Sequence, residues 1–594
     1  MAHLLVIGGA SSDILHFAGQ TATSAGGAGM YTAMAAHRSG MQVSLFGPRP
    51  SPIPKMLRPI AERLTAWHGQ AIPPEELPHF EIAYHNGKTT YLRAFVDAES
   101  NLMPGTLPPD LSPYDCVHIT PLGDVHRQSA FLQACRQRGA RRISVGTGPF
   151  LVDEPNVVRS IMEQADIFFM NDKEAAALFG SVETAKTWPG KLLFVTLGER
   201  GAVVIQGDYP TEVPGVPSNV LDPTGAGDTF CGAALAHLSL GEHPVMAARL
   251  AMPVASQMIE HVGPTALLWP EPPPAAPVDA RVVVDESRVK RVSQLIATLP
   301  EVAPFSFTGP DFPPVRHPAA LDQFFASTLQ QFSFWTHASG KYHLPLIAPL
   351  NGRQRKGSSY LYQAYLRPLT DDPEFYTPVR QADLTQPEML ALFRADDGSD
   401  PMPAVELHLA QAQGYGRDML ALGLTPRDVV EQAQASATPL QTFFELLDHI
   451  GGYKEDPLRK KSALLALTLN QRPEVFLAFG ANEQASPVID YHAQRFCLRV
   501  GLIDVGDETL RKELVGRQLL LPTAEWAVRH AAYIAVEQLV AASGKSAGAV
   551  DWFMFNSRKR CPEMTEPVCQ LCQLDPVCAH RKELFQPVLR TTFY

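Results

Sequence analysis

Two groups of residues in this sequence have types and spacings that could do chemistry. The first is the run Asp222-Pro-Thr-Gly-Ala-Gly-Asp228, whose glycines let the backbone approach a ligand while the N–H groups of a following helix face an anion. The second is a C-x7-C-x2-C-x5-C run formed by Cys561, Cys569, Cys572 and Cys578. Four thiolates at this spacing can hold one iron–sulfur cluster or one zinc ion. The sequence therefore predicts an anion-binding turn beside a carboxylate and, separately, a metal site.

The carboxylate of the first run is Asp228, which precedes a predicted helix, Phe230–Leu240. An Asp at this place can take a proton from a substrate hydroxyl as that hydroxyl attacks the γ-phosphate of ATP. Gly225, Ala226 and Gly227 would then form the turn that holds the anion. The alternative is an ordinary glycine-rich turn with an Asp helix cap.

Length and composition set the frame for these sites. A chain of 594 residues is too long for one ordinary core, so at least two domains are expected. It has no apolar run long enough for a membrane span and opens without the features of a signal peptide, which favours a cytoplasmic protein. The net charge of −11 falls mostly before residue 281, so neither half is basic. Local basic patches remain at Arg353–Lys356 and Arg558–Arg560, although solvated loops would explain both.

A Pro-rich stretch, Trp269–Pro277, divides two kinds of sequence pattern. Before it, apolar strands alternate with helical segments, which predicts an α/β sheet with crossover helices. The predicted strands are Leu4–Gly8, Val43–Phe46, Cys116–Ile119, Ile143–Gly146, Ile167–Met170 and Leu192–Thr196. After it, helices dominate, and the predicted ones include Thr425–Ala435, Leu440–His449, Lys460–Asn470 and Thr523–Ala542. We therefore expect an α/β domain at 1–268, a linker at 269–286 and an all-α domain at 287–594.

The first half resembles the PfkB/ribokinase family of carbohydrate and nucleoside kinases over about residues 3–268. The matching segments occur in the family's order: Gly8–Asp13, Gly26-Gly27-Ala28-Gly29, Asn171-Asp-Lys-Glu174, Thr196–Gly201 and Asp222–Phe230. The resemblance implies that Asp13, Gly26 and Gly27 contact the acceptor sugar. It implies that Asn171 and Glu174 organise Mg²⁺ and phosphates, and that Thr196, Gly198 and Gly201 lie against ATP. Departures at Gly47-Pro-Arg-Pro and Gly146-Thr-Gly148 leave sugar and nucleoside both open as substrates.

The second half resembles the helix–hairpin–helix glycosylases of the endonuclease III type. The segment Pro487–Gly501 is similar to the family's catalytic segment, and Ile450–Gly452 with Arg459–Ala463 is similar to its hairpin, with an insertion at Tyr453–Leu458. The hairpin and catalytic segment are placed at 446–503 and the Cys loop at 551–594. The resemblance implies a [4Fe–4S] cluster, although this run is one residue longer than the family's, and zinc is the alternative.

Two residues of this half are expected to act in catalysis. Cleavage of an N-glycosidic bond builds positive charge on the sugar, which a carboxylate stabilises, and Asp490 is the residue that matches the family's Asp. A helix N-cap is the structural alternative for it. Lys461 stands where members with lyase activity keep a Schiff-base Lys, although a phosphate contact or a solvated charge would also explain it.

Two further resemblances concern the substrate. Segments such as Gln330–Trp335, Gly357–Arg367 and Glu525–Arg529 look like the queuosine 5′-phosphate N-glycosylases, in which the catalytic Asp is followed by Tyr, here Tyr491. The alpha-glutamyl/putrescinyl thymine pyrophosphorylases, which act in thymine hypermodification, are also similar. Trp335 and Tyr491 are expected to contact the substrate. Trp335 also belongs to an aromatic set that either stacks on a base or packs in the core: Phe332, Phe334, Trp335, Tyr360 and Tyr362.

Three functional hypotheses follow. The first is a salvage enzyme that phosphorylates a nucleoside with ATP and then splits the 5′-monophosphate into base and ribose 5-phosphate. The second is a DNA base glycosylase or hypermodification enzyme fused to a small-molecule kinase. The third is an inactive nucleotide-sensing scaffold, which the intact Asp228 and Asp490 argue against. The near-neutral second half favours a small-molecule partner over nucleic acid, and a homodimer stays open.

Overall fold

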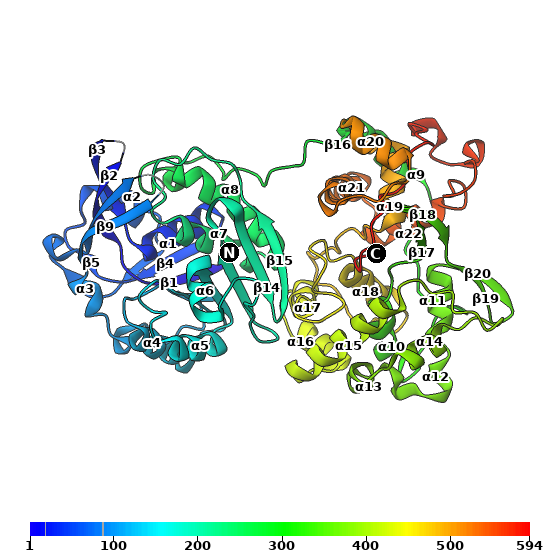
Figure 1. The fold of residues 1–594 in the computed structure, drawn as a ribbon, viewed down its shortest axis with the longest axis horizontal. Coiled ribbons are helices and arrows are strands. Elements are labelled where there is room, and N and C mark those ends of the chain that lie inside the picture. The colour runs from blue at the N-terminus through cyan, green and yellow to red at the C-terminus, as the bar shows by residue number, and fades with distance from the viewer. Residues whose placement is uncertain (18, 86–87) are drawn as a thin grey trace. The chain divides into compact units, whose positions relative to one another are not determined.

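The chain forms two compact units, Met1–Pro277 and Val278–Tyr594 (Figure 1). The computed structural model describes residues 1–17, 19–85 and 88–594. The division falls at the end of the Pro-rich stretch. Val282–Val284, within the expected linker, forms a strand, β16, that pairs with β21 (Ile503–Val505) of the second unit.

The first unit is built on a large, mainly parallel sheet. Among the described residues this sheet has nine strands in the order β15-β14-β13-β12-β11-β10-β1-β4-β6. Their bounds are β1 His3–Ile7, β4 Gln42–Phe46, β6 Ala66–His68, β10 Cys116–Ile119, β11 Ile143–Gly146, β12 Ile167–Asn171, β13 Leu192–Thr196, β14 Gly201–Gln206 and β15 Tyr209–Pro214. Strand β14 runs antiparallel to β13, and the edge strand β15 runs antiparallel to β14. Each of the six predicted strands overlaps one of these strands, so the α/β prediction for this half is confirmed.

Both faces of this sheet are buried, which explains why its strands are continuous apolar runs rather than alternating ones. On β1, Leu4 and Val6 belong to one core, and Leu5 and Ile7 belong to the other. Residues of α1, α7 and α8 pack in the first core, and residues of α4, α5 and α6 pack in the second (Figure 1). The helices of this unit are α1 Ala28–Arg38, α2 Arg58–Ala61, α3 Asp97–Ser100, α4 Val125–Gln137, α5 Pro155–Gln164, α6 Asp172–Phe179, α7 Ala226–Ser239 and α8 Pro244–Ile259.

A second, smaller sheet carries part of the candidate substrate site. Within the described ranges it has four strands in the order β3-β2-β8-β9. Their bounds are β2 Ser11–Phe17, β3 Gln20–Gly26, β8 His79–His85 and β9 Lys88–Phe95. In the register of β2 and β3, Asp13 pairs with Ser24 and Ser11 pairs with Gly26, which brings the two predicted sugar-binding segments together. A short ladder of β5 (Arg49–Pro50) with β7 (Ala71–Ile72) completes the strands of this unit.

The second unit is mostly helical. The four helices predicted for it correspond to α16, α17, α18 and α21. Its helices are α9 Glu286–Thr298, α10 Ala320–Thr328, α11 Ser358–Ala364, α12 Pro368–Asp371, α13 Pro378–Ala382, α14 Gln386–Phe393, α15 Val405–Leu422, α16 Pro426–Gln434, α17 Pro439–Leu447, α18 Lys460–Gln471, α19 Tyr491–Val500, α20 Glu508–Val515, α21 Pro522–Ser543 and α22 Ala547–Ser557. No described helix of the chain is both long and apolar enough to cross a membrane.

The all-α prediction for this unit misses three two-stranded ladders. They are β16–β21, β17 (Trp335–Ala338) with β18 (Lys341–Pro345), and β19 (Ile347–Leu350) with β20 (Arg353–Lys356). The basic run Arg353–Lys356 is therefore an edge strand rather than a loop. Its charges are partly paired, since Arg355 meets Asp311 and Lys356 meets Glu563. Charged side chains on an edge strand also discourage pairing with another chain.

Candidate functional sites

The glycine-rich turn of the first unit leads directly into helix α7. Gly225 caps this helix with φ 77°, a left-handed conformation that glycine adopts without strain. A Cβ atom at this position would lie 2.3 Å from the Tyr31 ring, so the close approach also requires glycine. Ala226 begins the helix, and Asp228 stands in its first turn, where the helix dipole favours an anion. The turn thus presents one carboxylate beside backbone N–H groups.

The protonation of Asp228 is set by its surroundings. Burial raises the pKa of Asp228 to about 6, and a backbone hydrogen bond partly opposes this effect. The carboxylate therefore remains ionised at neutral pH, with a proton affinity above that of a free Asp. These are the properties of a general base whose pKa has moved toward the working pH.

Asn171 and Glu174 form a capping box at the end of β12. The Glu174 N–H donates to Asn171 Oδ1 at 2.9 Å, and the Asn171 N–H donates to Glu174 Oε2 at 2.9 Å. Burial raises the pKa of Glu174, Asn171 lowers it, and the charge of Asp228 raises it further. Asn171 is also the register partner of Thr196 at the end of β13. Parallel strands thus bring these residues to one edge of the sheet, where ligands of such folds bind.

The turn after Thr196 depends on two glycines with positive φ. Gly198 has φ 62° and Gly201 has φ 99°. A Cβ atom on Gly201 would lie 2.1 Å from the Val213 carbonyl oxygen on β15. The predicted nucleotide-binding turn is therefore held close to the neighbouring strand.

Asp13 is a buried carboxyl at the small sheet. Its Oδ1 accepts a hydrogen bond of 3.2 Å from the Phe80 N–H, and a Cβ atom on Gly26 would lie 1.8 Å from its Oδ2. Burial raises the pKa of Asp13 to about 6, and hydrogen bonds from Ser11 and Phe80 oppose this. A Cβ atom on Gly27 would lie 2.6 Å from the Gly9 carbonyl oxygen, so both glycines are needed for this contact between segments.

In the second unit, Asp490 lines a cavity with about 660 Å³ of empty space. The Asp490 carboxyl caps helix α19, because its Oδ1 accepts a hydrogen bond of 2.9 Å from the Ala493 N–H. Asp490 is therefore a helix N-cap, as the structural alternative predicts, and it also lines the cavity. The described residues that line it are Phe307, Phe312, Gln331, Phe334, Ser358, Tyr362, Lys460, Leu464, Val488, Asp490, Tyr491, His492, Asp551, Trp552, Phe555 and Tyr594. Aromatic rings thus form much of the wall around two carboxyls and one amine.

A buried ion pair contacts the segments that carry Asp490 and Lys460. Arg529 of α21 is fully buried and donates to both carboxylate oxygens of Asp456, at 2.8 and 2.6 Å. Arg529 also donates to the Ile489 carbonyl at 3.2 Å, next to Asp490. Asp456 in turn accepts from the Lys460 N–H at 2.9 Å, at the start of α18. The pair therefore fixes both segments that carry the cavity's charges.

The structure does not bring Lys461 into this cavity. Lys461 is buried, and its Nζ lies 4.6 Å from the centre of the Phe332 ring. Burial lowers its pKa, and the nearby Glu455 carboxylate opposes this. Lys460 lines the cavity instead, with its Nζ donating to the Gln331 carbonyl at 2.9 Å. Burial lowers the pKa of Lys460 to about 8, and Asp490 opposes this.

The predicted aromatic set divides between cavity and core. Phe334, Tyr362 and Tyr491 line the cavity. Trp335 is 3% exposed and stacks on Tyr342 with ring centres 5.3 Å apart, so it packs in the core. Phe332 stacks on His408, and the Tyr360 hydroxyl donates to the Phe393 carbonyl at 2.8 Å.

Sequence reasoning did not single out several cavity residues. They are Phe307, Phe312, Lys460, Asp551, Trp552 and Phe555. Asp551 and Trp552 are the first residues of the segment 551–594, which the sequence assigned to the Cys loop, and neither was given a role of its own. Burial and the charge of Asp490 raise the pKa of Asp551 to about 8, while Lys460 opposes this. The sequence signal that could have identified Asp551 is the presence of a carboxyl residue in the half that resembles the glycosylases.

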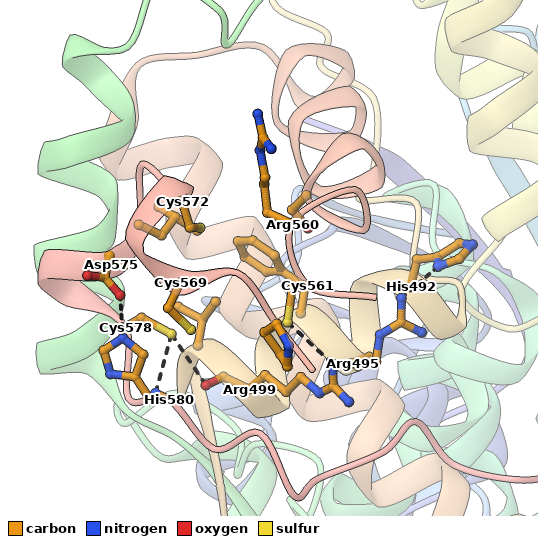
Figure 2. A pocket seen from close by; sticks show the side chains of 15 residues that line it. His492, Arg495, Arg499, Arg560, Cys561, Cys569, Cys572, Asp575, Cys578 and His580 are labelled. Atoms are coloured by element: carbon orange, nitrogen blue, oxygen red, sulfur yellow. Dashed lines mark hydrogen bonds and ion pairs between the residues drawn. The ribbon is translucent and has the colours of Figure 1, made fainter. Parts of the chain in front are cut away.

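The four Cys of the C-terminal run surround a second cavity, with about 520 Å³ of empty space (Figure 2). Each is a free thiol and partly exposed. Arg499 Nη1 donates to Cys561 Sγ at 3.3 Å, and the His580 N–H donates to Cys578 Sγ at 3.3 Å. Apolar residues and three arginines, Arg495, Arg499 and Arg560, line the same cavity.

This donor set fits a thiolate-bound metal centre. Four thiols around one cavity suit a cubane cluster, and nearby guanidinium groups would offset its negative charge. A single metal ion could instead bind Cys569, Asp575 and His580, whose ligand atoms lie within 4.8 Å of one another. His580 Nε2 and Asp575 Oδ1 are 2.8 Å apart. Among the described residues no three of the four Sγ atoms form so close a group, so a single ion held by the four thiols would require them to move together.

The segment expected to be a hairpin lies between α17 and α18. Helix α17 ends at Leu447, and α18 begins at Lys460 after Arg459, which has φ 52°. The connection passes through Gly452, with φ 88°, and its Asp448 forms an ion pair with Arg459. The two helices pack on each other. The arrangement is a helix–loop–helix whose loop includes the insertion at Tyr453–Leu458.

Comparison with known proteins identifies the class of the first unit. Residues 122–271 match the model of the pfkB family carbohydrate kinases. The N-terminal part of the chain is a PfkB-family carbohydrate or nucleoside kinase domain with a ribokinase-like α/β fold.

The chain is also similar to individual kinases and solved structures over the first unit. A cytidine kinase from Thermococcus kodakarensis is 26% identical over 277 residues, which cover 44% of this chain and 98% of that kinase. Among solved structures, adenosine kinase from Sinorhizobium meliloti is 21% identical with a TM-score of 0.38, covering 44% of this chain and 95% of that one. Aminoimidazole riboside kinase from Salmonella enterica is 20% identical with a TM-score of 0.36, covering 45% and 96%.

Proposed function

We propose that this chain is a bifunctional enzyme acting on nucleosides. Its first unit transfers the γ-phosphate of ATP to the 5′-hydroxyl of a nucleoside. Its second unit hydrolyses the N-glycosidic bond of the resulting 5′-monophosphate and releases base and ribose 5-phosphate. Fusion of the two activities suits consecutive steps, because the product of the first is the substrate of the second.

The kinase step is supported by the placement of Asp228. It stands in the first turn of α7, next to an anion-binding turn, with its pKa raised to about 6. The cytidine kinase, which is matched over 98% of its own length, supports a nucleoside acceptor. Asn171 and Glu174 at the sheet edge would hold Mg²⁺ and phosphates, and Thr196, Gly198 and Gly201 would lie against ATP.

The hydrolytic step rests on one observation: Asp490 lines a cavity together with several aromatic residues. Such rings stack on a planar base, and a carboxylate beside the sugar stabilises the positive charge that forms as the bond breaks. A single 5′-phosphate needs few cations. Lys460 lines the cavity, and Arg558 lies 3.7 Å from the centre of the Phe555 ring. Binding a DNA duplex would require many more.

The four Cys would hold a [4Fe–4S] cluster in this proposal. When bound, the cluster would supply thiolate–metal bonds that stabilise the C-terminal loop. Zinc in the same cavity would serve the same structural purpose.

The test uses the full-length enzyme, a panel of nucleosides, and ATP with Mg²⁺. Wild type should release base only when ATP is present. Asp228→Asn should release none from nucleosides but should cleave a supplied 5′-monophosphate, whereas Asp490→Asn should accumulate the monophosphate. ATP-independent excision from modified duplex DNA would refute the sequential scheme and favour a DNA glycosylase.

A further inference from the structure

We propose that Asp551 is the acid that donates a proton to the departing base in the second unit. This inference rests on the proposed hydrolysis of a nucleoside 5′-monophosphate. It assigns the cavity's second carboxyl a role different from that of Asp490, so that one carboxyl acts on the sugar and the other on the base.

The two carboxyls of the cavity come from different elements and differ in their hydrogen bonds. Asp490 precedes α19, Asp551 lies in α22, and both line the same cavity. Asp490 is committed to its helix through the Ala493 N–H, which also fixes its orientation. Within the part of the chain that the structure describes, no hydrogen bond to the Asp551 carboxyl occurs. Asp551 is therefore free to bond to a ligand in the cavity.

The aromatic wall places a base next to Asp551. Trp552 follows Asp551 in sequence, and its ring stacks with Phe555 at a centre-to-centre distance of 5.5 Å and an angle of 23°. Phe312 and Tyr362, which also line the cavity, form another ring pair at 4.9 Å. A planar base held against such rings presents its ring nitrogens at its edge, where a carboxyl can reach them.

The charges around Asp551 favour its protonated form. Burial raises its pKa to about 8, the Asp490 carboxylate adds to this, and Lys460 of α18 opposes it. Tyr362 of α11, whose own pKa is raised, faces it as a neutral hydroxyl. His492 of α19 also lines the cavity, and burial and nearby cations lower its pKa well below the usual value. At neutral pH these surroundings therefore favour the protonated form of Asp551.

The reaction balances with these groups and one water molecule. The C1′–N bond breaks, its electron pair goes to the base nitrogen, and the Asp551 proton goes to the base. Water adds its hydroxyl to C1′ and gives its proton to Asp490. Asp551 regains a proton from solvent, and Asp490 returns its proton to solvent, so that both carboxyls end as they began.

The experiment compares two 5-phosphorylated ribosides that differ in their leaving group. One is a nucleoside 5′-monophosphate that wild type cleaves, and the other is 4-nitrophenyl β-ribofuranoside 5-phosphate. The nitrophenolate leaves without a proton, so it does not need the acid. For Asp551→Asn we expect a loss of about 10²–10⁴-fold on the nucleotide and less than about 10-fold on the nitrophenyl substrate. Asp551→Glu should restore part of the nucleotide activity. Asp371→Asn, an exposed change in the same unit, is the matched control.

The pH profile gives an independent readout. Wild-type cleavage of the nucleotide should fall as the pH rises through about 8, and this alkaline decline should be missing with the nitrophenyl substrate. Equal losses by Asp551→Asn on both substrates, with an unchanged pH profile, would overturn the role of Asp551 and leave the hydrolysis standing. Failure of wild type to cleave either substrate would overturn the proposed function itself.

Discussion

Asp490 and Arg499 stand at opposite ends of the same helix, α19. Asp490 caps the first turn and lines the aromatic cavity, while Arg499 donates to Cys561 Sγ at 3.3 Å and to the Pro562 carbonyl at 2.8 Å. His492, in the first turn, lines both cavities. Ten residues of helix thus link the candidate catalytic carboxyl to the Cys loop. We therefore expect that a well-ordered Cys loop helps to hold α19, and with it Asp490, in position.

The first prediction concerns the metal. Purified protein should show the broad visible absorption of an iron–sulfur cluster, and Cys569→Ser or Cys572→Ser should remove it. Because metal binding stabilises the loop, either change should also lower the thermal midpoint of unfolding and reduce base release. Absorption spectra, metal analysis and calorimetry measure these effects. Cys135→Ala, at a buried thiol of the first unit, should keep the metal. A colourless wild type with one zinc ion would contradict the cluster.

The second prediction separates the two roles of Asp490. Asn is as good a helix N-cap as Asp, so Asp490→Asn should keep the thermal midpoint nearly unchanged. It should lower base release by about 10²–10⁴-fold, because an amide does not stabilise positive charge on the sugar. Chromatography of the released base measures the rate. Near-wild-type release by a folded variant would assign Asp490 to capping alone.

The third prediction concerns phosphoryl transfer. Asp228→Asn should bind ATP but lower phosphoryl transfer by about 10²–10⁴-fold, because it has no base. Since burial raises the pKa of Asp228 to about 6, the wild-type rate should rise with pH through about 6 as the carboxylate ionises. A coupled assay for ADP, run at several pH values between about 5 and 8, measures both effects. Asp208→Asn, exposed in the same unit, is the control and should retain both the rate and its pH dependence.

The fourth prediction concerns stability. The folded-state pKa of Asp228 lies above the ordinary value of 3.8, so the folded protein binds this proton more tightly than the unfolded chain. The stabilising contribution is complete below pH 3.8 and is lost as the pH rises through about 6. Wild type and Asp228→Asn should therefore differ little in acid, and the variant should be the more stable one at neutral pH. Calorimetric scans at several pH values test this, and a variant that is less stable at neutral pH would contradict it.

The fifth prediction compares two glycines with left-handed backbones. Gly225 has φ 77° and a Cβ atom there would lie 2.3 Å from the Tyr31 ring, whereas Gly180 has φ 89° and open space around it. Both changes to Ala carry a backbone cost of about 1–2 kcal/mol. Gly225→Ala should in addition displace the anion-binding turn and abolish phosphoryl transfer, while Gly180→Ala should keep it. Equal activity of the two variants would show that the turn tolerates a side chain.

Local sequence was enough to predict much of the first unit. Its buried strands are short apolar runs, and β10, β11 and β13 have the bounds expected from the sequence. The run Asp222–Asp228 is contiguous, so its turn and helix start follow from glycines and one Asp in order. The helical character of the second unit also followed from periodicity. Its small ladders did not, because short edge strands such as β20 depend on partners elsewhere in the fold.

The cavity of the second unit was decided by tertiary structure. Lys460 and Lys461 are neighbours in sequence, but consecutive helix residues point about 100° apart, so packing alone selects which one faces Asp490. The packing of α18, α19 and α21 around the Arg529–Asp456 pair makes that choice, and the contacts of α22 with α19 and α21 bring Asp551 into the same cavity. Sequence determined which residue types were available. Only the tertiary structure decided which of them meet, because each comes from a different helix and no local rule relates their orientations.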